Sequence, residues 1–141
     1  MVTMSTEEWK RFVLEKPRPA VAAVTRANGS PHATPVWIDL DGDEIVFTTG
    51  RDSLKGRTLV RDPRICLVIQ DEVPPFSFVA IVGVATISED LDELRRWAGR
   101  LGARYMGADQ ADAYAARNGV PGELLVRVNP QRVTAERDIA L

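Results

Sequence analysis

The sequence predicts a mainly β domain in which six or seven antiparallel strands form a barrel and three or four helices lie around it. Three observations support this fold class. Strand-like runs are joined by short turns that carry the hairpin signals Asn28-Gly29 and Asp41-Gly42. A longer run, 76–88, is apolar on both faces, as expected of a strand in a closed barrel. In other segments the apolar residues recur every three or four positions, which is the spacing of an amphipathic helix.

The first half of the chain is expected to hold two helices and three strands. Ser5 and Glu8 form a capping box, which predicts a helix through about Leu14 that ends at the sequence KPRP. Ser53 is the expected N-cap of a second, short helix, which ends before Pro63. The strands are predicted over residues 20–26, 32–40 and 44–50.

The second half is expected to hold four strands and two helices. Ser88 is the predicted cap of a helix from about Asp90 to Tyr105. A short helix follows over 108–119, before Pro121. The strands are predicted over residues 64–70, 76–88, 123–128 and 132–138.

The composition indicates one small globular domain. The 141 residues are 45% apolar and 27% charged, with a net charge of −2, and such a chain builds a single core. Residues 1–141 are expected to form one domain, with the N-terminal helix in 1–16 and the barrel in 17–138. The mild acidity argues against nucleic-acid binding. No apolar stretch approaches the ~20 residues that span a bilayer, and no signal peptide is recognisable, so a cytoplasmic location without a membrane partner is expected.

Covalent and metal chemistry find little support in the sequence. One cysteine and one histidine exclude the usual structural zinc sites. Cys66 lies in the apolar run RICLVIQ, where a buried hydrophobe is expected rather than a nucleophile. His32 follows a hairpin turn and has no nucleophile motif beside it. We therefore predict no metal site and identify no catalytic residue.

The most unusual stretch, TTGRDSLKGRTLVRDPR, runs from Thr48 to Arg64. It holds five basic residues against two aspartates, a net charge of +3 in an acidic chain. A helix is expected to begin there, and the free N–H groups of a helix start bind anions. Lys55 and Arg57 lie in the first turn, where the helix dipole disfavours cations unless an anion is bound, and Gly56 would allow a ligand to approach the backbone. The same residues also fit a solvated helix, and the sequence physics leaves both possibilities open.

The order of residues also resembles a known family. The segment AVAAVTRANGSPHATPVWIDLDGDEIVFTTGRDSLKGRTLVRDPRICLVI is similar to the split β-barrel flavin and deazaflavin oxidoreductases related to pyridoxamine 5′-phosphate oxidase. Among these it looks most like the small actinobacterial enzymes that bind coenzyme F420. PPFSFVAIVGVATIS, GARYMGADQADAY and NGVPGELLVRVNPQRVTAERD resemble the same branch, so the resemblance covers roughly residues 17–138. Its most specific motifs are SLKGRTLVRDPR and RYMGAD.

The resemblance implies an FMN-binding-like split barrel that forms a homodimer, with a cofactor site in each of two grooves between the protomers. The residues implied to hold the cofactor phosphate are Lys55, Gly56 and Arg57, with Thr49 and Ser53 nearby. The residues implied to face the cofactor ring are Pro35, Val36, Trp37 and Thr48. The second protomer is expected to complete the site with Pro75, Phe76 and Ser77 and with Arg104, Tyr105 and Met106.

The same resemblance implies an enzyme that transfers a hydride between reduced F420 and a small organic substrate with an activated double bond. F420 is a polyanion, which fits the local charge of +3. Its deazaflavin carries the redox chemistry, so no nucleophile or metal motif is needed. Two alternatives stay open: an FMN-dependent enzyme of the same fold, and a protein that binds or carries F420 without catalysis.

Overall fold

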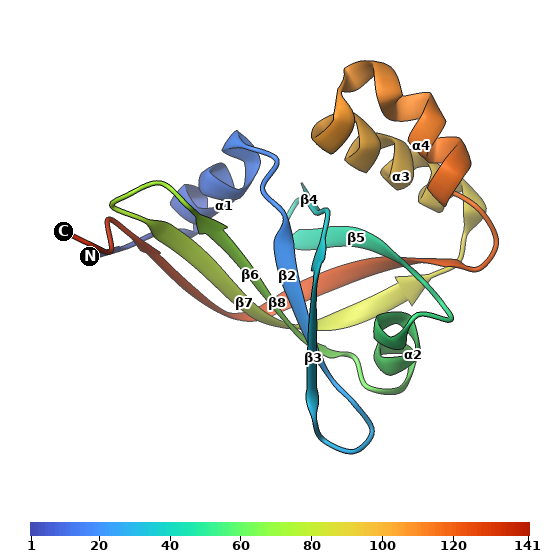
Figure 1. Cartoon of the computed structure of the whole chain (residues 1–141), viewed down its shortest axis with the longest axis horizontal. Coiled ribbons are helices and arrows are strands. Elements are labelled where there is room, and N and C mark those ends of the chain that lie inside the picture. Colours follow the sequence, from blue (N-terminus) through green and yellow to red (C-terminus); the bar gives the residue numbers. More distant parts are fainter.

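The computed structural model describes residues 1–141 and shows an antiparallel sheet with helices around it (Figure 1). The strands are β1 (Val2–Thr3), β2 (Ala20–Thr25), β3 (Pro31–Val36), β4 (Asp39–Asp41), β5 (Glu44–Gly50), β6 (Arg64–Asp71), β7 (Ser77–Ser88) and β8 (Glu123–Arg137). The helices are α1 (Thr6–Glu15), α2 (Leu54–Arg61), α3 (Leu91–Met106), the 3-10 turn η1 (Ala108–Gln110) and α4 (Ala111–Asn118). None of these helices has the length and the apolar character needed to cross a membrane.

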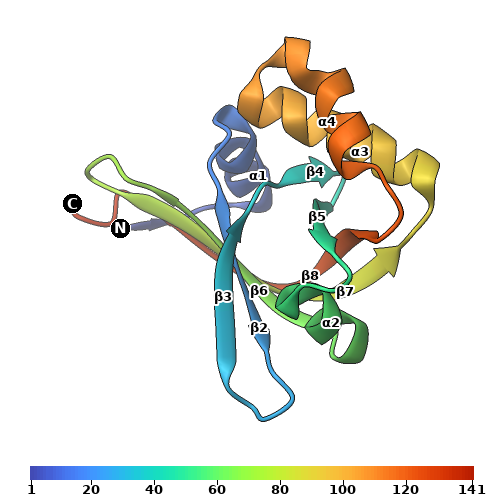
Figure 2. The ribbon, with the colours of Figure 1, turned by 45° about the vertical axis from the view of Figure 1, so that its right-hand side comes forward.

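The connection between the two end strands closes the sheet into a barrel. The strand order is β3-β2-β6-β7-β8-β5-β4, every neighbouring pair is antiparallel, and β1 pairs with the C-terminal end of β8. β3 and β4 stand at opposite ends of this order, yet only Trp37 and Ile38 separate them in the chain. The sheet must therefore curl until its ends meet, as Figure 2 shows. The predicted antiparallel barrel is confirmed.

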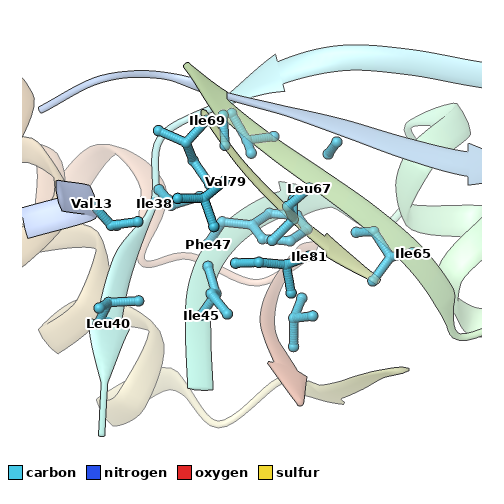
Figure 3. Close-up of a cluster of buried hydrophobic side chains, with 14 of the residues drawn as sticks. Val13, Ile38, Leu40, Ile45, Phe47, Ile65, Leu67, Ile69, Val79 and Ile81 are labelled. Carbon is cyan, nitrogen blue, oxygen red and sulfur yellow. The ribbon is translucent and has the colours of Figure 1, made fainter. Parts of the chain in front are cut away.

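Alternate residues of the strands fill the interior of the barrel. A cluster of 23 buried apolar residues lies there, among them Phe47, Leu67 and Ile81, which have no exposed surface (Figure 3). Val13 of α1 belongs to the same cluster, so α1 packs against the barrel. A second cluster, formed by Val46, Leu94, Trp97 and Leu125, attaches α3 to the outer face of β5 and β8.

One outer face of the barrel is apolar and uncovered. Val82 and Val84 of β7 are 44% and 37% exposed, and Val21 of β2 is 44% exposed. Val21 is paired with Val68 of β6, and the neighbouring strand β7 lies beside β6. We call Val21, Val68, Val82 and Val84 the valine face.

The cap predicted for α1 agrees with the structure, and the one predicted for α3 does not. Ser5 Oγ accepts from the Glu8 N–H at 3.1 Å and the Glu8 carboxylate accepts from the Ser5 N–H at 3.4 Å, so the predicted capping box is confirmed. The prediction that Ser88 caps α3 is wrong, because Ser88 is still paired in β7 and Asp90 is the N-cap. The Asp90 carboxylate accepts from the N–H groups of Asp92 at 2.9 Å and Glu93 at 3.1 Å.

The predicted strand over 32–40 is interrupted at Trp37 and Ile38, where the chain turns from β3 into β4. The fully buried Ile38 would leave its N–H without a strand partner at this turn. The hydroxyl of Tyr105 accepts from that N–H at 3.0 Å and donates to the Arg18 carbonyl at 2.7 Å. A side chain from α3 thus supplies the hydrogen bonds that the ladder cannot.

The two strands predicted over 123–128 and 132–138 are one continuous strand, β8. Its pairing with β7 shifts register between Val82 and Gly83, which pair with Arg132 and Pro130 and leave Gln131 as an extra residue. This is a β-bulge, which carries the strand past Pro130, between the two predicted runs. A Cβ at Gly83 would lie 2.6 Å from the Asn129 carbonyl oxygen, so the bulge requires glycine there.

We expect Tyr105→Phe to lower the free energy of unfolding by about 1–3 kcal/mol, because it leaves the buried Ile38 N–H without an acceptor. Denaturant titration followed by circular dichroism measures the change. Tyr114→Phe is the matched control, since the Tyr114 hydroxyl takes part in none of the hydrogen bonds of the chain. An equal loss in both variants would contradict this role of Tyr105.

Candidate functional site

A cavity of about 460 Å³ lies where β3, β5, α2 and the helices α3 and α4 meet. Its lining combines apolar, aromatic and basic side chains and includes no carboxylate: Pro19, Pro35, Val36, Trp37, Thr48, Lys55, Ala98, Leu101, Arg117 and Asn118. Five of these were singled out in the sequence, namely Pro35, Val36, Trp37, Thr48 and Lys55. The structure therefore brings the end of β3, the end of β5 and the start of α2 to one cavity.

The start of α2 is held by a small network of hydroxyl groups. Ser53 Oγ accepts from the Gly56 N–H at 3.0 Å and donates to the Gly50 carbonyl at 2.7 Å. Thr49 Oγ1 lies 3.2 Å from Ser53 Oγ. The predicted N-cap is confirmed, and the amides of Leu54 and Lys55 are left without intrahelical acceptors, as at any helix start.

Gly56 serves the packing of α2 against its own loop. A Cβ at this position would lie 2.0 Å from the Gly50 carbonyl oxygen and 3.0 Å from that of Arg51. The residue is buried. The close approach inferred from this glycine is therefore an approach of backbone to backbone, which fixes where the helix begins and which side chains reach the cavity.

Lys55 is the unusual side chain of the cavity. It is only 9% exposed, and its Nζ donates to Thr34 Oγ1 at 2.7 Å. Burial lowers the pKa of this lysine below its usual range, because removal from water disfavours the ammonium form. No carboxylate lines the cavity to offset the charge. A buried cation that lacks an anionic partner favours binding of an anion beside it.

The basic stretch from Thr48 to Arg64 does not act as one patch. Arg51 pairs with Glu89, Arg61 donates to the Thr25 carbonyl at 2.7 Å, and Arg64 pairs with Asp62 at 2.7 Å. Arg57 is exposed and lines a separate hollow of about 520 Å³, whose other lining residues are Arg51, Asp52, Val60, Ile87, Glu89 and Leu124. Lys55 and Arg57 thus face different sides of α2.

The remaining predicted residues lie outside the cavity of their own chain. Phe76 and Ser77 lie at the hairpin between β6 and β7, which is close to both termini and on the opposite side of the molecule from α2 and α4 (Figure 1). Pro75 belongs to the same hairpin, and its carbonyl and that of Phe76 accept from the amides of Ala140 and Ile139. Their role in a partner's site stays a prediction.

Arg104 and Tyr105 make contacts within their own chain. The Arg104 guanidinium donates to the carbonyls of Val13 at 2.6 Å and Lys16 at 2.9 Å, and so binds the end of α1. The Tyr105 ring stacks on Trp37 with 5.2 Å between the ring centroids, and so supports the wall of the cavity from behind. Met106 is 51% exposed. The structure gives the first two residues structural roles, and their predicted contribution to a second protomer stays a prediction.

Sequence reasoning missed the part of the cavity that α3 and α4 provide. Ala98, Leu101, Arg117 and Asn118 line the cavity but were not predicted as site residues. Arg117 in the last turn of α4 is what the negative end of the helix dipole favours, so its presence there did not by itself indicate a ligand. No local pattern shows that this helix end lies beside Lys55.

Comparison with known proteins gives the family. A model described as pyridoxamine 5′-phosphate oxidase matches residues 5–136. The chain belongs to this family. A search of curated proteins finds no match.

Among solved structures, a conserved hypothetical protein of Mycobacterium tuberculosis is 28% identical, with a TM-score of 0.84 over 98% of this chain and 89% of that one. An F420 reductase is 23% identical, with a TM-score of 0.69 over 87% and 94% of the two chains. A putative pyridoxamine 5′-phosphate oxidase of Listeria innocua is 19% identical, with a TM-score of 0.72 over 93% and 98%. The similarity to the last two structures shows a shared fold and nothing more.

We expect Gly56→Ala to lower the free energy of unfolding by about 1–3 kcal/mol, because the new methyl group would overlap the Gly50 carbonyl. Helix propensity alone predicts the opposite sign, a gain of about 1 kcal/mol for alanine. Urea titration distinguishes the two. Val60→Ala, at a 63% exposed position of the same helix, should change stability little. A stabilised Gly56→Ala protein would show that the loop can move away.

Proposed function

We propose that this protein is an oxidoreductase that binds coenzyme F420 and transfers a hydride between the reduced cofactor and a small organic substrate with an activated double bond. The observation that carries the proposal is the buried, unpaired ammonium of Lys55 at the start of α2, inside a cavity with an aromatic and apolar wall. Membership of the pyridoxamine 5′-phosphate oxidase family and a fold shared with an F420 reductase support it.

The residues present fit a cofactor that joins a phosphate to a flat ring. The Lys55 ammonium and the free amides at the start of α2 offer positive charge and donors to a phosphate oxygen. Pro35, Val36 and Trp37 offer a wall for a ring, and Trp37 is held in place by its stack on Tyr105. The volume of about 460 Å³ is in the range of small-molecule sites.

When bound, the deazaflavin supplies the hydride chemistry. The tasks of the chain are to bind the cofactor, to orient a substrate against its ring and to keep water out. Ala98 and Leu101 present apolar surface to the cavity, which excludes water from that side. Lys55 is the cavity's one cation that is nearly buried, so it contributes most to the positive potential there.

We further propose that two copies of the chain pair through the valine face. Its residues are apolar and more than a third exposed at Val21, Val82 and Val84, and no helix of the chain covers them. The valine face of a second copy of the chain would bury it, because a two-fold interface buries the same patch on both subunits. In such a dimer the hairpin with Phe76 and Ser77 extends beyond its own barrel and would be available to the partner's site.

The cofactor assignment is tested by titration with F420 and FMN side by side, followed by fluorescence. We expect tight binding of F420 by the native protein. Lys55→Ala is expected to raise the F420 Kd by at least roughly tenfold, because a charge-assisted hydrogen bond contributes about 1.5–3 kcal/mol. Arg96→Gln, an exposed position on α3, should leave the Kd unchanged.

Each outcome of this titration has a distinct meaning. Normal binding by the Lys55→Ala variant would contradict the site. Preference for FMN would replace the cofactor but keep the site, since FMN also joins a phosphate to a tricyclic ring. Tight F420 binding without turnover of enones and quinones would favour a carrier.

Dimerisation is tested by light scattering on a size-exclusion column. We expect the native chain to elute as a dimer and Val82→Glu to elute as a monomer with an unchanged circular dichroism spectrum, because a charge at this 44% exposed position disrupts only an interface. Leu14→Glu, at a 47% exposed position of α1, is the control and should stay dimeric. A native monomer would overturn the proposed pairing.

A further inference from the structure

A second cation, Arg117, also lines the cavity, and it comes from a helix that is far from Lys55 in the sequence. Arg117 and Asn118 form the last turn of α4 and line the cavity together with Ala98 and Leu101 of α3. Arg117 therefore gives the cavity a positively charged group that comes from the helical hairpin rather than from the barrel. The proposed cofactor contacts of Lys55 and of the aromatic and apolar wall do not involve Arg117.

Close packing of α3 against α4 fixes the position of the last turn of α4, which carries Arg117. Gly99 and Gly102 of α3 face α4 at the seam between the two helices, and a Cβ at Gly102 would lie 2.3 Å from the Tyr114 Cβ. A Cβ at Gly99 would lie 3.2 Å from the Ala111 carbonyl oxygen. Because the two helices approach so closely, α4 cannot shift along α3 without a clash, and the end of α4 is held beside the cavity.

A row of aromatic rings holds the Arg117 guanidinium. It lies over the Tyr114 ring, 5.5 Å from the centroid. Tyr114 packs against Trp37 with 5.4 Å between centroids, and Trp37 stacks on Tyr105 at 5.2 Å. The row starts at the residue that closes the barrel and ends at a cation, so the guanidinium is positioned by the same packing that builds the cavity wall.

The charge of Arg117 is not matched by a carboxylate in the cavity. Glu123 is the carboxylate that interacts electrostatically with Arg117. Burial raises the pKa of Glu123, and the positive charge of Arg117 lowers it. Glu123 does not line the cavity, and the lining contains two cations and no anion. The two cations come from different helices, Lys55 from α2 and Arg117 from α4, and each can bind an anionic group of a ligand.

We propose that Arg117 is a specificity-determining residue that binds a carboxylate of the ligand, distinct from the anion held by Lys55. The proposal rests on the function proposed above and adds the chemical class of a bound group. A planar guanidinium binds a carboxylate through two parallel N–H bonds, which suits a positioned arginine. The carboxylate belongs either to the substrate, whose apolar body would contact Ala98 and Leu101, or to the oligoglutamate tail of the cofactor.

Two matched ligand pairs test the proposal and distinguish the sources. The first is cinnamate and its neutral isostere cinnamamide, titrated by NMR into the protein without cofactor. The second is F420 with and without its glutamate tail, titrated by fluorescence. In one of these pairs we expect the native protein to prefer the carboxylate-bearing member by about tenfold, and Arg117→Gln to abolish that preference. Arg96→Gln, on the exposed side of the same hairpin, should retain it.

Loss of preference in the cinnamate pair identifies a substrate carboxylate, and loss in the F420 pair identifies the tail. Equal preferences in the native protein and in Arg117→Gln, in both pairs, would overturn the proposal. If the native protein binds neither form of F420, the proposed function fails while the cinnamate pair still decides the role of Arg117. Arg117 is exposed, so the variant is expected to fold, and its circular dichroism spectrum and thermal midpoint verify this.

Discussion

The structure depends on how its sheet closes between Trp37 and Ile38. The two end strands are joined by these residues alone, so the chain must turn where the ladder offers no partner. The Tyr105 hydroxyl takes the place of that partner, because it accepts from the Ile38 N–H and donates to the Arg18 carbonyl. The Tyr105 ring then stacks on Trp37. Barrel closure and the position of the cavity wall are therefore one arrangement.

The cavity owes its charge to packing rather than to a cluster of basic residues. Gly56 lets α2 begin directly against the carbonyls of the preceding loop, and this places Lys55 inward. The ammonium is removed from water at a free-energy cost, and only one hydroxyl of the chain compensates it. Such an uncompensated charge is typical of a site completed by a ligand, because a purely structural lysine would gain a carboxylate partner or extend to solvent.

Local signals in the sequence predicted the elements that depend on neighbouring residues. The Ser5–Glu8 capping box, the Ser53 cap and the hairpin glycines at 29 and 42 all appear as expected. The errors fall where distant contacts override local preference. Ser88 resembles a helix cap but stays in a strand because Leu125 pairs with it, and the proline near the middle of β8 is accommodated by a bulge opposite Gly83. The break after Val36 requires Tyr105, which no local pattern reveals.

The amino-acid order is sufficient to identify an antiparallel barrel, the helix start at Ser53 and a family likeness, because each depends on spacing along the chain. It is insufficient to show which cations are free. Arg51, Arg61 and Arg64 are engaged by Glu89, the Thr25 carbonyl and Asp62, while Lys55 is turned into a cavity that Arg117 also lines. Most of these partners are far apart in sequence, and only the folding of the sheet and the packing of α3 against α4 bring them together. The stretch from Thr48 to Arg64 is therefore a basic segment in sequence but a single buried lysine at the site.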